Sequence, residues 1–411
     1  MKRKLITQMR HMWRSNIWLV VELSVVAIVL WLFFSIFVKF MDARLQYRGY
    51  DTTDMWHAYT QTIDKESEAY KPYSDTLHSE VTDFAVIMSR LKDNPWVECV
   101  SAGTNAVPFT MNYFGELYMR READTTYLYS GNCRMVTPEI IRMFRLEGLN
   151  GETTEQLAET IERGEVILGD IGRIEKDWRI SPPEMFNGHD IVSASDSVTT
   201  LHVGATAYTF RRSDYEPPRG GNILMAAGPS DMQDVVIRVK EGHGNDFIES
   251  IKPDDLEAGN VYLSALKSLD TMATDVNKEV NSMMRNFAIG GGFLLIIVFL
   301  GFLGTFWFRA QERTSEIAVR MVNGATRADI VRRLLGESFL LLAMGAVICA
   351  AVVVALDYFD IKILELELTE TDRWLGYVLA IFSLAIMVTA GVWWPARRAM
   401  AVNMAEALKD Q

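Results

Sequence analysis

The sequence contains no glycine followed by lysine. Because none of its 27 glycines has lysine at the next position, the nucleotide-binding loop G-x-x-x-x-G-K-[ST] is absent from these 411 residues. A G-x-S-x-G elbow and an H-E-x-x-H pair are absent as well. His189, His202 and His243 match no recognised ligand spacing, so we expect exposed loop histidines rather than a metal site. We therefore expect a chain that is not an enzyme and that hydrolyses no ATP itself.

Cysteine is scarce too, with three residues. Cys99 and Cys133 lie in the charged central part of the chain. They fit either a disulfide formed in an oxidising compartment or two free buried thiols. Cys349 falls inside an apolar run and is interpreted as a small packing residue.

Charge is nearly missing from four long apolar runs. They cover Ile17 to Val38, Phe287 to Phe308, Ser338 to Leu356 and Trp374 to Trp394, and Glu22 is the single charged residue among them. A helix needs about 20 residues to cross the hydrocarbon core, so each run predicts a membrane span. The first run is longer than the apolar part of a signal peptide and no cleavage site follows it, which indicates a retained anchor. Glu22 is either a functional acid or a residue paired near the interface.

The distribution of basic residues predicts the orientation. Residues 1–16 carry only basic charges, and residues 309–337 carry more basic than acidic ones. By the positive-inside rule, both segments and the tail 395–411 are cytoplasmic, whereas residues 39–286 and the loop 357–373 lie outside. The outer segment holds most acidic residues of a chain whose net charge is −12. Such a surface argues against nucleic acid as a partner.

The outer segment mixes helix and strand signals. Apolar residues at helical spacing predict a helix over Thr76 to Leu91, and Pro138 opens another that ends at Phe144. Strands are predicted at Val97–Ala102, Glu116–Arg121, Thr126–Tyr129, Cys133–Val136, Val166–Leu168, Thr199–Val203, Thr206–Arg211, Ile223–Met225, Val235–Lys240 and Val261–Leu263. The expected fold class is an α-helical membrane protein with four transmembrane helices and a large α+β extracytoplasmic domain between helices 1 and 2. Residues of about 136–232 are expected to form a β-rich insertion in that domain.

A stalk helix is predicted over residues of about 266–286. Apolar residues recur there every three or four positions, and no proline interrupts the chain before the end of the second span. We expect stalk and span to form one continuous rod. Gly290, Gly291 and Gly292 stand where this rod would enter the membrane, and they fit either a hinge or a close-packing site.

The loop 309–337 between the second and third spans predicts a helix, a tight corner and a second helix. Arg313 to Val322 forms the first helix, and Asn323-Gly324 supplies its left-handed end. Thr326 then caps the second helix, with Asp329 as its capping-box partner. Because the second helix continues into the third span, the corner would be tied to a membrane element. The charged first helix fits either a partner of mixed charge or an ordinary solvated face.

At these residues the sequence resembles the FtsX-like permeases, a family that includes the MacB-like and lipoprotein-release permeases of bacterial ABC transporters. The similar stretches are Glu312-Arg313-Thr314-Ser315-Glu316-Ile317-Ala318-Val319-Arg320-Met321, Asn323-Gly324-Ala325, Asp329-Ile330, Pro395-Ala396-Arg397-Arg398-Ala399 and Glu406-Ala407-Leu408. Asn323 departs from the small or variable residue that is usual there. The layout of one span, a large exterior domain and three clustered spans is similar to theirs as well.

The resemblance implies a mechanotransmission permease in a bacterial inner membrane. A cytoplasmic ABC ATPase dimer would bind ATP and Mg and grip the loop 309–337, and movement would pass along the second span to the outer domain. Since only 16 residues precede the first span, we expect the ATPase on a separate chain. A second permease subunit, identical or not, and periplasmic or outer-membrane components are implied as partners. The coupling residues carried over are Arg313, Glu316, Ile317, Arg320, Met321, Gly324, Ala325 and Asp329.

Small residues in the spans predict close helix approach in lipid. The candidate packing residues are Gly291, Gly301, Gly304, Gly345, Ala346 and Ala350. For the pairs of the third span, Gly345 with Cys349 and Ala346 with Ala350, contacts within one subunit and contacts between two subunits fit equally well.

Two other functions fit the layout less well. A membrane-anchored receptor with an extracytoplasmic ligand-binding domain would need a cytoplasmic output domain, and the inward segments are short. A secondary transporter or channel would need broken helices or buried charges in its spans. The sequence does not disclose a cargo.

Overall fold

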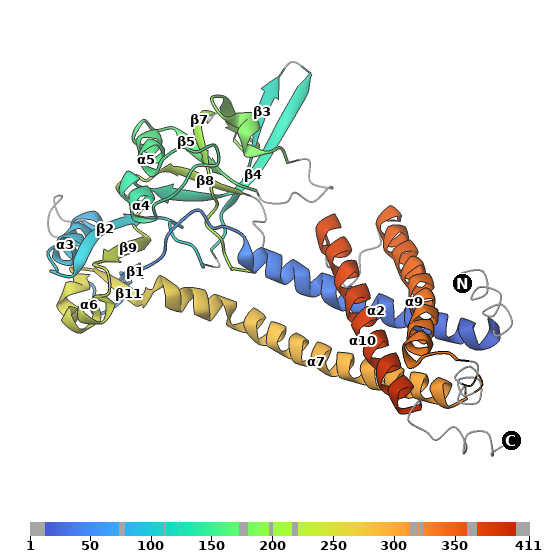
Figure 1. Cartoon of the computed structure of the whole chain (residues 1–411). Coiled ribbons are helices and arrows are strands. Elements are labelled where there is room, and N and C mark those ends of the chain that lie inside the picture. Colours follow the sequence, from blue (N-terminus) through green and yellow to red (C-terminus); the bar gives the residue numbers. More distant parts are fainter. Residues whose placement is uncertain are drawn as a thin grey trace. The chain divides into compact units, whose positions relative to one another are not determined.

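The computed structural model describes residues 13–73, 79–110, 112–122, 124–171, 180–196, 200–215, 221–312, 319, 322, 324–359 and 368–399 (Figure 1). The chain divides into two compact units. We call Met1–Asp42 together with Ser282–Gln411 the membrane unit, and Ala43–Asn281 the inserted domain. The predicted fold class, four membrane helices with a large domain of helices and strands between the first two, is confirmed.

Among the described residues, four helices are long and apolar enough to cross a membrane. They are α2 (Trp13–Leu45), α7 (Leu269–Glu312), α9 (Arg327–Tyr358) and α10 (Glu370–Ala399). Each predicted apolar run lies inside one of them. All four helices extend beyond the predicted runs, because charged residues outside the hydrocarbon continue the same helices.

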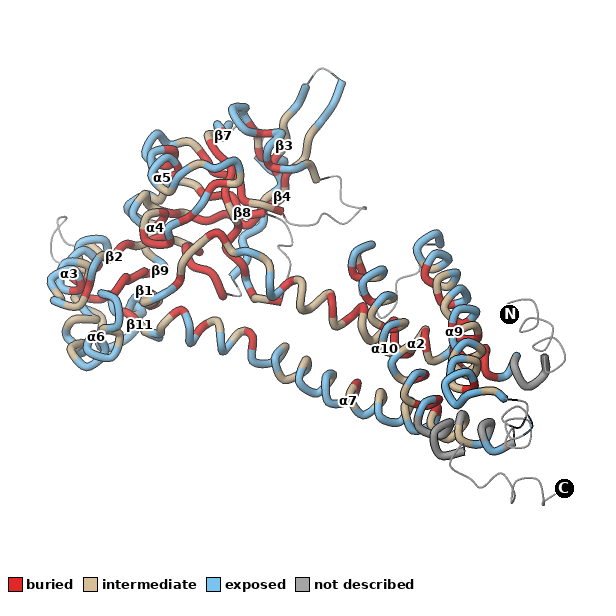
Figure 2. The backbone as a smooth tube through the Cα atoms, viewed as in Figure 1, coloured by how far each residue is buried: buried red, intermediate tan, exposed pale blue. Residues whose placement is uncertain are grey.

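The membrane unit packs around α2. Half of the most apolar window of α2 is buried, against 11% of that of α7, so α7 is the least covered of the four helices in the described structure (Figure 2). The core combines apolar side chains of all four helices. Its fully buried members include Leu23, Ala27, Leu30 and Trp31 of α2, Phe302 of α7, Cys349 of α9, and Ala380, Leu384 and Val388 of α10. Cys349 thus has the packing role predicted for it.

Arg373, near the start of α10, is held in the same unit. Thr369 caps this helix by exchanging hydrogen bonds with Asp372, at 3.0 and 3.2 Å. The indole nitrogen of Trp31 donates to the carbonyl oxygen of Arg373 at 3.0 Å, and the Arg373 guanidinium pairs with Asp357 of α9. These bonds join α2, α9 and α10 at one end of the unit.

A five-stranded antiparallel sheet forms one part of the inserted domain, in the order β10-β11-β1-β9-β2. Its strands are β1 (Met55–Thr62), β2 (Val97–Gly103), β9 (Asp234–Val239), β10 (Glu257–Ala258) and β11 (Val261–Ser268). Helices α3 (Glu80–Lys92) and α6 (Gly244–Ser250) pack on it, and Phe84, Ile87 and Phe247 meet the buried side chains of β9. Every residue of β9 is buried, because the strand lies between β1 and β2 and its two faces pack in different core clusters, Val236 in one and Val235, Ile237 and Val239 in the other.

A closed barrel forms the other part, in the order β3-β4-β8-β5-β7-β6. Its strands are β3 (Gly115–Glu122), β4 (Thr125–Val136), β5 (Val166–Gly169), β6 (Asp190–Ser193), β7 (Thr200–Ala207) and β8 (Gly221–Ala226). Helices α4 (Pro138–Met143) and α5 (Thr154–Glu162) lie against it (Figure 1). Short 3-10 turns occur at Pro183–Phe186 and Pro253–Asp255.

The predicted start of the β-rich insertion near residue 136 is wrong. Strands β3 and β4 precede that position and already belong to the barrel, where β4 pairs with both β3 and β8. The error arose because β4 was divided into two short strands, which hid a single strand long enough to serve two neighbours. Likewise, the two strands predicted across Thr199 to Arg211 are replaced by the single strand β7, which ends at Ala207.

Four elements of the inserted domain were not predicted, namely β1, β6, β10 and α5. Strand β1 lies at the centre of the five-stranded sheet, and α5 covers part of the barrel. The helix at Pro138 was predicted correctly, with Thr137 as its N-cap. The helix predicted over Thr76–Leu91 begins at Glu80 in the structure, and residues 74–78 lie outside the described part.

Candidate functional site

The corner between the second and third spans is the candidate site, and the structure describes its second half. Of the predicted coupling residues, Arg313, Glu316, Ile317, Arg320 and Met321 lie outside the described residues, as does most of the first helix expected there. Gly324, Ala325 and Asp329 are described.

The corner has the backbone geometry expected from its residue types. Gly324 adopts φ +91°, a conformation that residues with a Cβ rarely take. At Thr326, the side-chain oxygen accepts from the Asp329 amide at 3.2 Å, and the Asp329 carboxylate accepts from the Thr326 amide at 3.1 Å. This reciprocal capping box was predicted from the sequence and is confirmed.

The capped helix is continuous with a membrane element. Helix α9 runs without interruption for 32 residues, about 48 Å at 1.5 Å per residue. Ala325 packs beside Ile330, which is 5% exposed, together with Val331 and Leu334. The corner therefore sits on a small apolar cluster at the start of a rigid rod that crosses the membrane unit.

Helix α7, on the other side of the loop, is a second rod. It runs for 44 residues, about 66 Å, and joins the predicted stalk to the second span in one helix. The helix stays continuous through Gly290, Gly291 and Gly292. A Cβ added at Gly291 would lie 1.9 Å from the ring of Phe33 on α2, so this position is a close-packing site. Gly290 and Gly292 have no described atom within 4 Å of such a Cβ.

The remaining packing residues divide into two groups. Gly345 of α9 faces Leu23 and Ser24 of α2, with contacts of 3.3 and 3.4 Å for an added Cβ, so it packs within the subunit. Ala346 accepts a hydrogen bond from Tyr377 of α10 at 3.1 Å through its carbonyl oxygen. Ala350, on the next turn of α9, is half-buried.

Gly301 and Gly304 behave differently. Within the described structure, no atom lies within 4 Å of a Cβ added at either residue. In the described part of the chain, these two positions therefore make no close helix contact. Packing against a second subunit stays a prediction.

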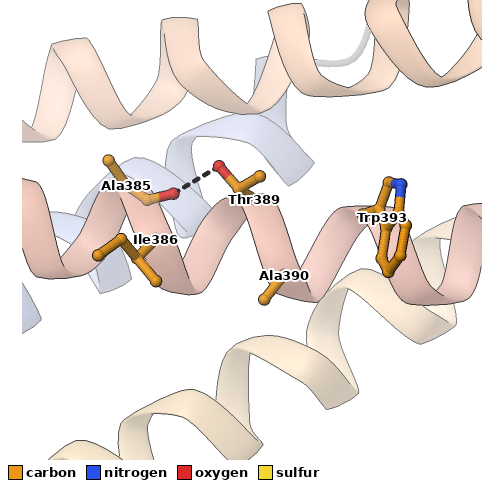
Figure 3. Close-up of a pocket in the computed structure, with 5 residues that line it drawn as sticks. All are labelled: Ala385, Ile386, Thr389, Ala390 and Trp393. Atoms are coloured by element: carbon orange, nitrogen blue, oxygen red, sulfur yellow. Dashed lines mark hydrogen bonds between the residues drawn. The ribbon is translucent and has the colours of Figure 1, made fainter.

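One shallow groove lies on α10 (Figure 3). It is lined by Ala385, Ile386, Thr389, Ala390 and Trp393. The Thr389 hydroxyl donates to the Ala385 carbonyl oxygen at 2.7 Å, so the one hydroxyl of the lining is bonded to its own helix. A surface of this composition suits apolar contact and offers no group for catalysis.

The cysteines and the possible metal ligands of the described residues are two kinds of candidate chemical group. Cys99 and Cys133 are free and lie in different sheets, so the structure has the two-thiol alternative rather than the disulfide. Burial raises the pKa of the Cys133 thiol to about 11. No group of three His, Cys, Asp or Glu side chains that could hold a metal ion occurs in the described part of the chain.

A comparison with protein families decides the assignment. Residues 288–404, which contain α9, α10 and most of the corner, match the family model of the FtsX-like permease C-terminal domain. Residues 288–404 therefore form an FtsX-like permease C-terminal domain. The matched region begins inside α7, two residues before the glycine triplet, and includes every predicted coupling residue.

Two individual proteins are similar to parts of this chain. It is 28% identical over 193 residues to the probable syringafactin export ATP-binding/permease protein SyfD of Pseudomonas syringae pv. tomato, covering 44% of this chain and 27% of that protein. The match therefore spans well under half of that relative's length. The extracellular domain of the noncanonic ABC-type transporter YknZ from Gram-positive bacteria aligns along its full length with 51% of this chain, at 10% identity and a TM-score of 0.30. That score is too low to establish a common fold.

Proposed function

We propose that this chain is the permease subunit of an ABC transporter of a bacterial inner membrane. A separate ATPase dimer binds ATP and Mg and contacts the loop 309–337. Through this contact it changes the position of the inserted domain, which lies outside the membrane. The family match over residues 288–404 is the observation that carries the proposal. The capped corner supports it, because it fixes the loop to a helix that continues through the membrane unit.

The proposal includes an orientation and partners. Both termini and the loop 309–337 face the cytoplasm, since these segments carry the basic excess. A second permease subunit completes the two-fold arrangement that an ATPase dimer requires. The relative SyfD is named for syringafactin export as an ATP-binding/permease protein, and we carry over to this chain the permease role without the cargo. Export, lipoprotein release and regulation of envelope enzymes all remain open as the output.

Co-purification tests the contact with the ATPase. The full chain is purified from its own cells with the loop intact, and the ATPase that accompanies it is identified by mass spectrometry and by its ATP hydrolysis. Glu316→Arg and Gly324→Trp are expected to lose that ATPase. At Gly324, a Cβ in the left-handed region costs about 1 to 3 kcal/mol, which distorts the corner.

Matched variants separate this effect from general damage. Gly336→Trp places the same side chain in α9, where no described atom lies within 4 Å of an added Cβ, and it should retain the ATPase. Gly324→Asn should retain it in part, because asparagine tolerates the left-handed region better than tryptophan. Normal recovery of the ATPase with both Glu316→Arg and Gly324→Trp would show that the loop is not the contact.

A further inference from the structure

A short segment of the inserted domain contacts the end of α2. We call Thr209–Tyr215, which directly follows β7 of the barrel, the joint loop. The Arg211 guanidinium, 7% exposed, donates to the carbonyl oxygen of Ala43 at 3.1 Å and to that of Tyr47 at 2.7 Å. Ala43 lies in the last turn of α2, whose carbonyl groups have no partner within the helix. Arg211 therefore caps the end of the first membrane helix.

The same loop contacts the first part of α7. The Asn277 side-chain oxygen accepts from the Ser213 hydroxyl at 2.9 Å and from the Asp214 amide at 3.1 Å. Its amide nitrogen donates to the Asp214 carboxylate at 2.8 Å. Asn277 is 5% exposed, so these three bonds are shielded from water. One turn further on, the Asn281 side-chain oxygen accepts from the Tyr215 hydroxyl.

Two basic residues at the end of α2 bind the loop directly. Arg44 donates to the Tyr215 hydroxyl at 3.0 Å, and the same hydroxyl donates to Asn281 of α7. Arg48 pairs with the Asp214 carboxylate at 2.6 Å, and the other oxygen of that carboxylate accepts from Asn277. Tyr215 thus contacts both helices, and Asp214 joins α7 to Arg48, three residues after the end of α2.

The joint loop is in turn fixed to the barrel and to the segments around it. The amide of Arg211 donates to the Tyr50 hydroxyl at 3.2 Å, and its carbonyl oxygen accepts from the Phe109 amide at 3.0 Å. Phe210 is buried in the main core cluster of the domain, and its carbonyl oxygen accepts from Asn222 of β8 at 3.2 Å. Movement of the loop therefore requires movement of the barrel.

Resting on the proposed function, we propose that the joint loop is the positioning element that passes displacement of α2 and α7 to the barrel as one rigid movement. These two helices are the ones that continue from the inserted domain into the membrane unit. Arg211 holds the end of the first, and Asn277 holds the second to Ser213 and Asp214. A joint built from buried, mutually satisfied polar groups has a fixed geometry, because any slip leaves several of these groups without partners.

Hydrogen exchange of the full permease with its co-purified ATPase tests this role. Exchange is measured by mass spectrometry without nucleotide and with ATP plus vanadate, which traps the ATPase with ADP and vanadate after hydrolysis. The nucleotide-dependent difference is read at the corner near Thr326 and along the barrel strands. The variants are Asn277→Leu, which removes the three bonds, and Asn286→Leu, the same change at an exposed position of the same helix. ATP hydrolysis and thermal unfolding are recorded for both.

For the native complex and for Asn286→Leu, we expect nucleotide-dependent exchange at the corner and in the barrel. In Asn277→Leu, the corner response and ATP hydrolysis should persist while the barrel response is lost. Persistence of the barrel response in Asn277→Leu would overturn the role of the joint loop and leave the proposed function intact. Absence of any nucleotide response in the native complex, at the corner as well as in the barrel, would instead contradict the proposed function.

A covalent replacement tests rigidity separately. Ser213→Cys combined with Asn277→Cys removes the same bonds and puts two thiols at positions whose native side chains are in direct contact, with their oxygens 2.9 Å apart. The reduced form should lose the barrel response, and oxidation to the disulfide, confirmed by peptide mapping, should restore it. If the oxidised form stays unresponsive while its ATP hydrolysis is normal, the joint has to open during the cycle and the rigid coupling is wrong.

Discussion

Gly291→Ala is expected to weaken the membrane unit, although alanine is the better helix former. The added Cβ would lie 1.9 Å from Cε2 and 2.0 Å from Cζ of the Phe33 ring. That ring has little room to move, because it stacks on Phe287 at 4.8 Å and meets Phe34 edge-on at 5.3 Å. Overpacking of this kind costs about 1 to 3 kcal/mol.

The neighbouring glycines provide the reference. Replacing glycine by alanine inside a helix stabilises it by about 0.5 to 1 kcal/mol, and Gly290→Ala and Gly292→Ala should show that gain, since no described atom lies near the added methyl group. The helix-propensity gain cancels when Gly291→Ala is compared with Gly290→Ala. The difference in free energy of unfolding between these two variants then isolates the steric cost, about 1 to 3 kcal/mol.

Unfolding by SDS in mixed micelles, followed by tryptophan fluorescence, measures these differences. Combining Gly291→Ala with Phe33→Leu should recover part of the loss, and a double-mutant cycle gives the coupling between the two positions. Equal stability of Gly290→Ala, Gly291→Ala and Gly292→Ala would refute the packing role and favour a hinge at the triplet.

Three further outcomes are expected. Thr326→Ala should destabilise the start of α9 by about 0.5 to 2 kcal/mol, seen as faster hydrogen exchange after the corner; an unchanged rate would show that the capping box is dispensable. Iodoacetamide at pH 8 should modify Cys133 about 100-fold more slowly than an unperturbed thiol, since its pKa of about 11 lies two units above the reference value of 9.0, and the rate should rise up to about pH 11. Mass mapping without reductant should find Cys99 and Cys133 as thiols, and a bridged peptide would contradict the structure.

Local signals explain what the sequence predicted well. The length of an uncharged apolar run is enough to predict a membrane helix, and Thr326 with Asp329 three residues later is enough to predict a cap. The continuity of α7 followed from the absence of proline and from a regular apolar spacing. In each case the decisive contacts lie within one helix, so no knowledge of the tertiary fold was required.

Contacts distant in sequence explain the failures. Strand β1 lies between β11 and β9, strands that are far from it in the chain, and nothing in its own residues reveals those neighbours. The joint loop was missed for the same reason, because Arg211 and Ala43 are 168 residues apart. One signal for the joint loop was available in the sequence. Asn277 and Asn281 are four residues apart and so lie on one face of the stalk helix, which is otherwise apolar on its inner side. Polar residues at such positions indicate that a polar partner packs against the helix.

The first part of α7 combines two kinds of contact that together fix its register. A slip by one turn would bring Asn281 to the place of Asn277 and Arg285 to that of Asn281, so polar contacts of a similar kind would partly re-form. The apolar side excludes this slip, because Ala273 would replace the fully buried Leu269 in the core of the domain. A Leu-to-Ala change in a core costs about 2 to 5 kcal/mol. The polar bonds therefore set the rotation of α7 and the buried leucine sets its height, so the helix is held to the inserted domain in one register.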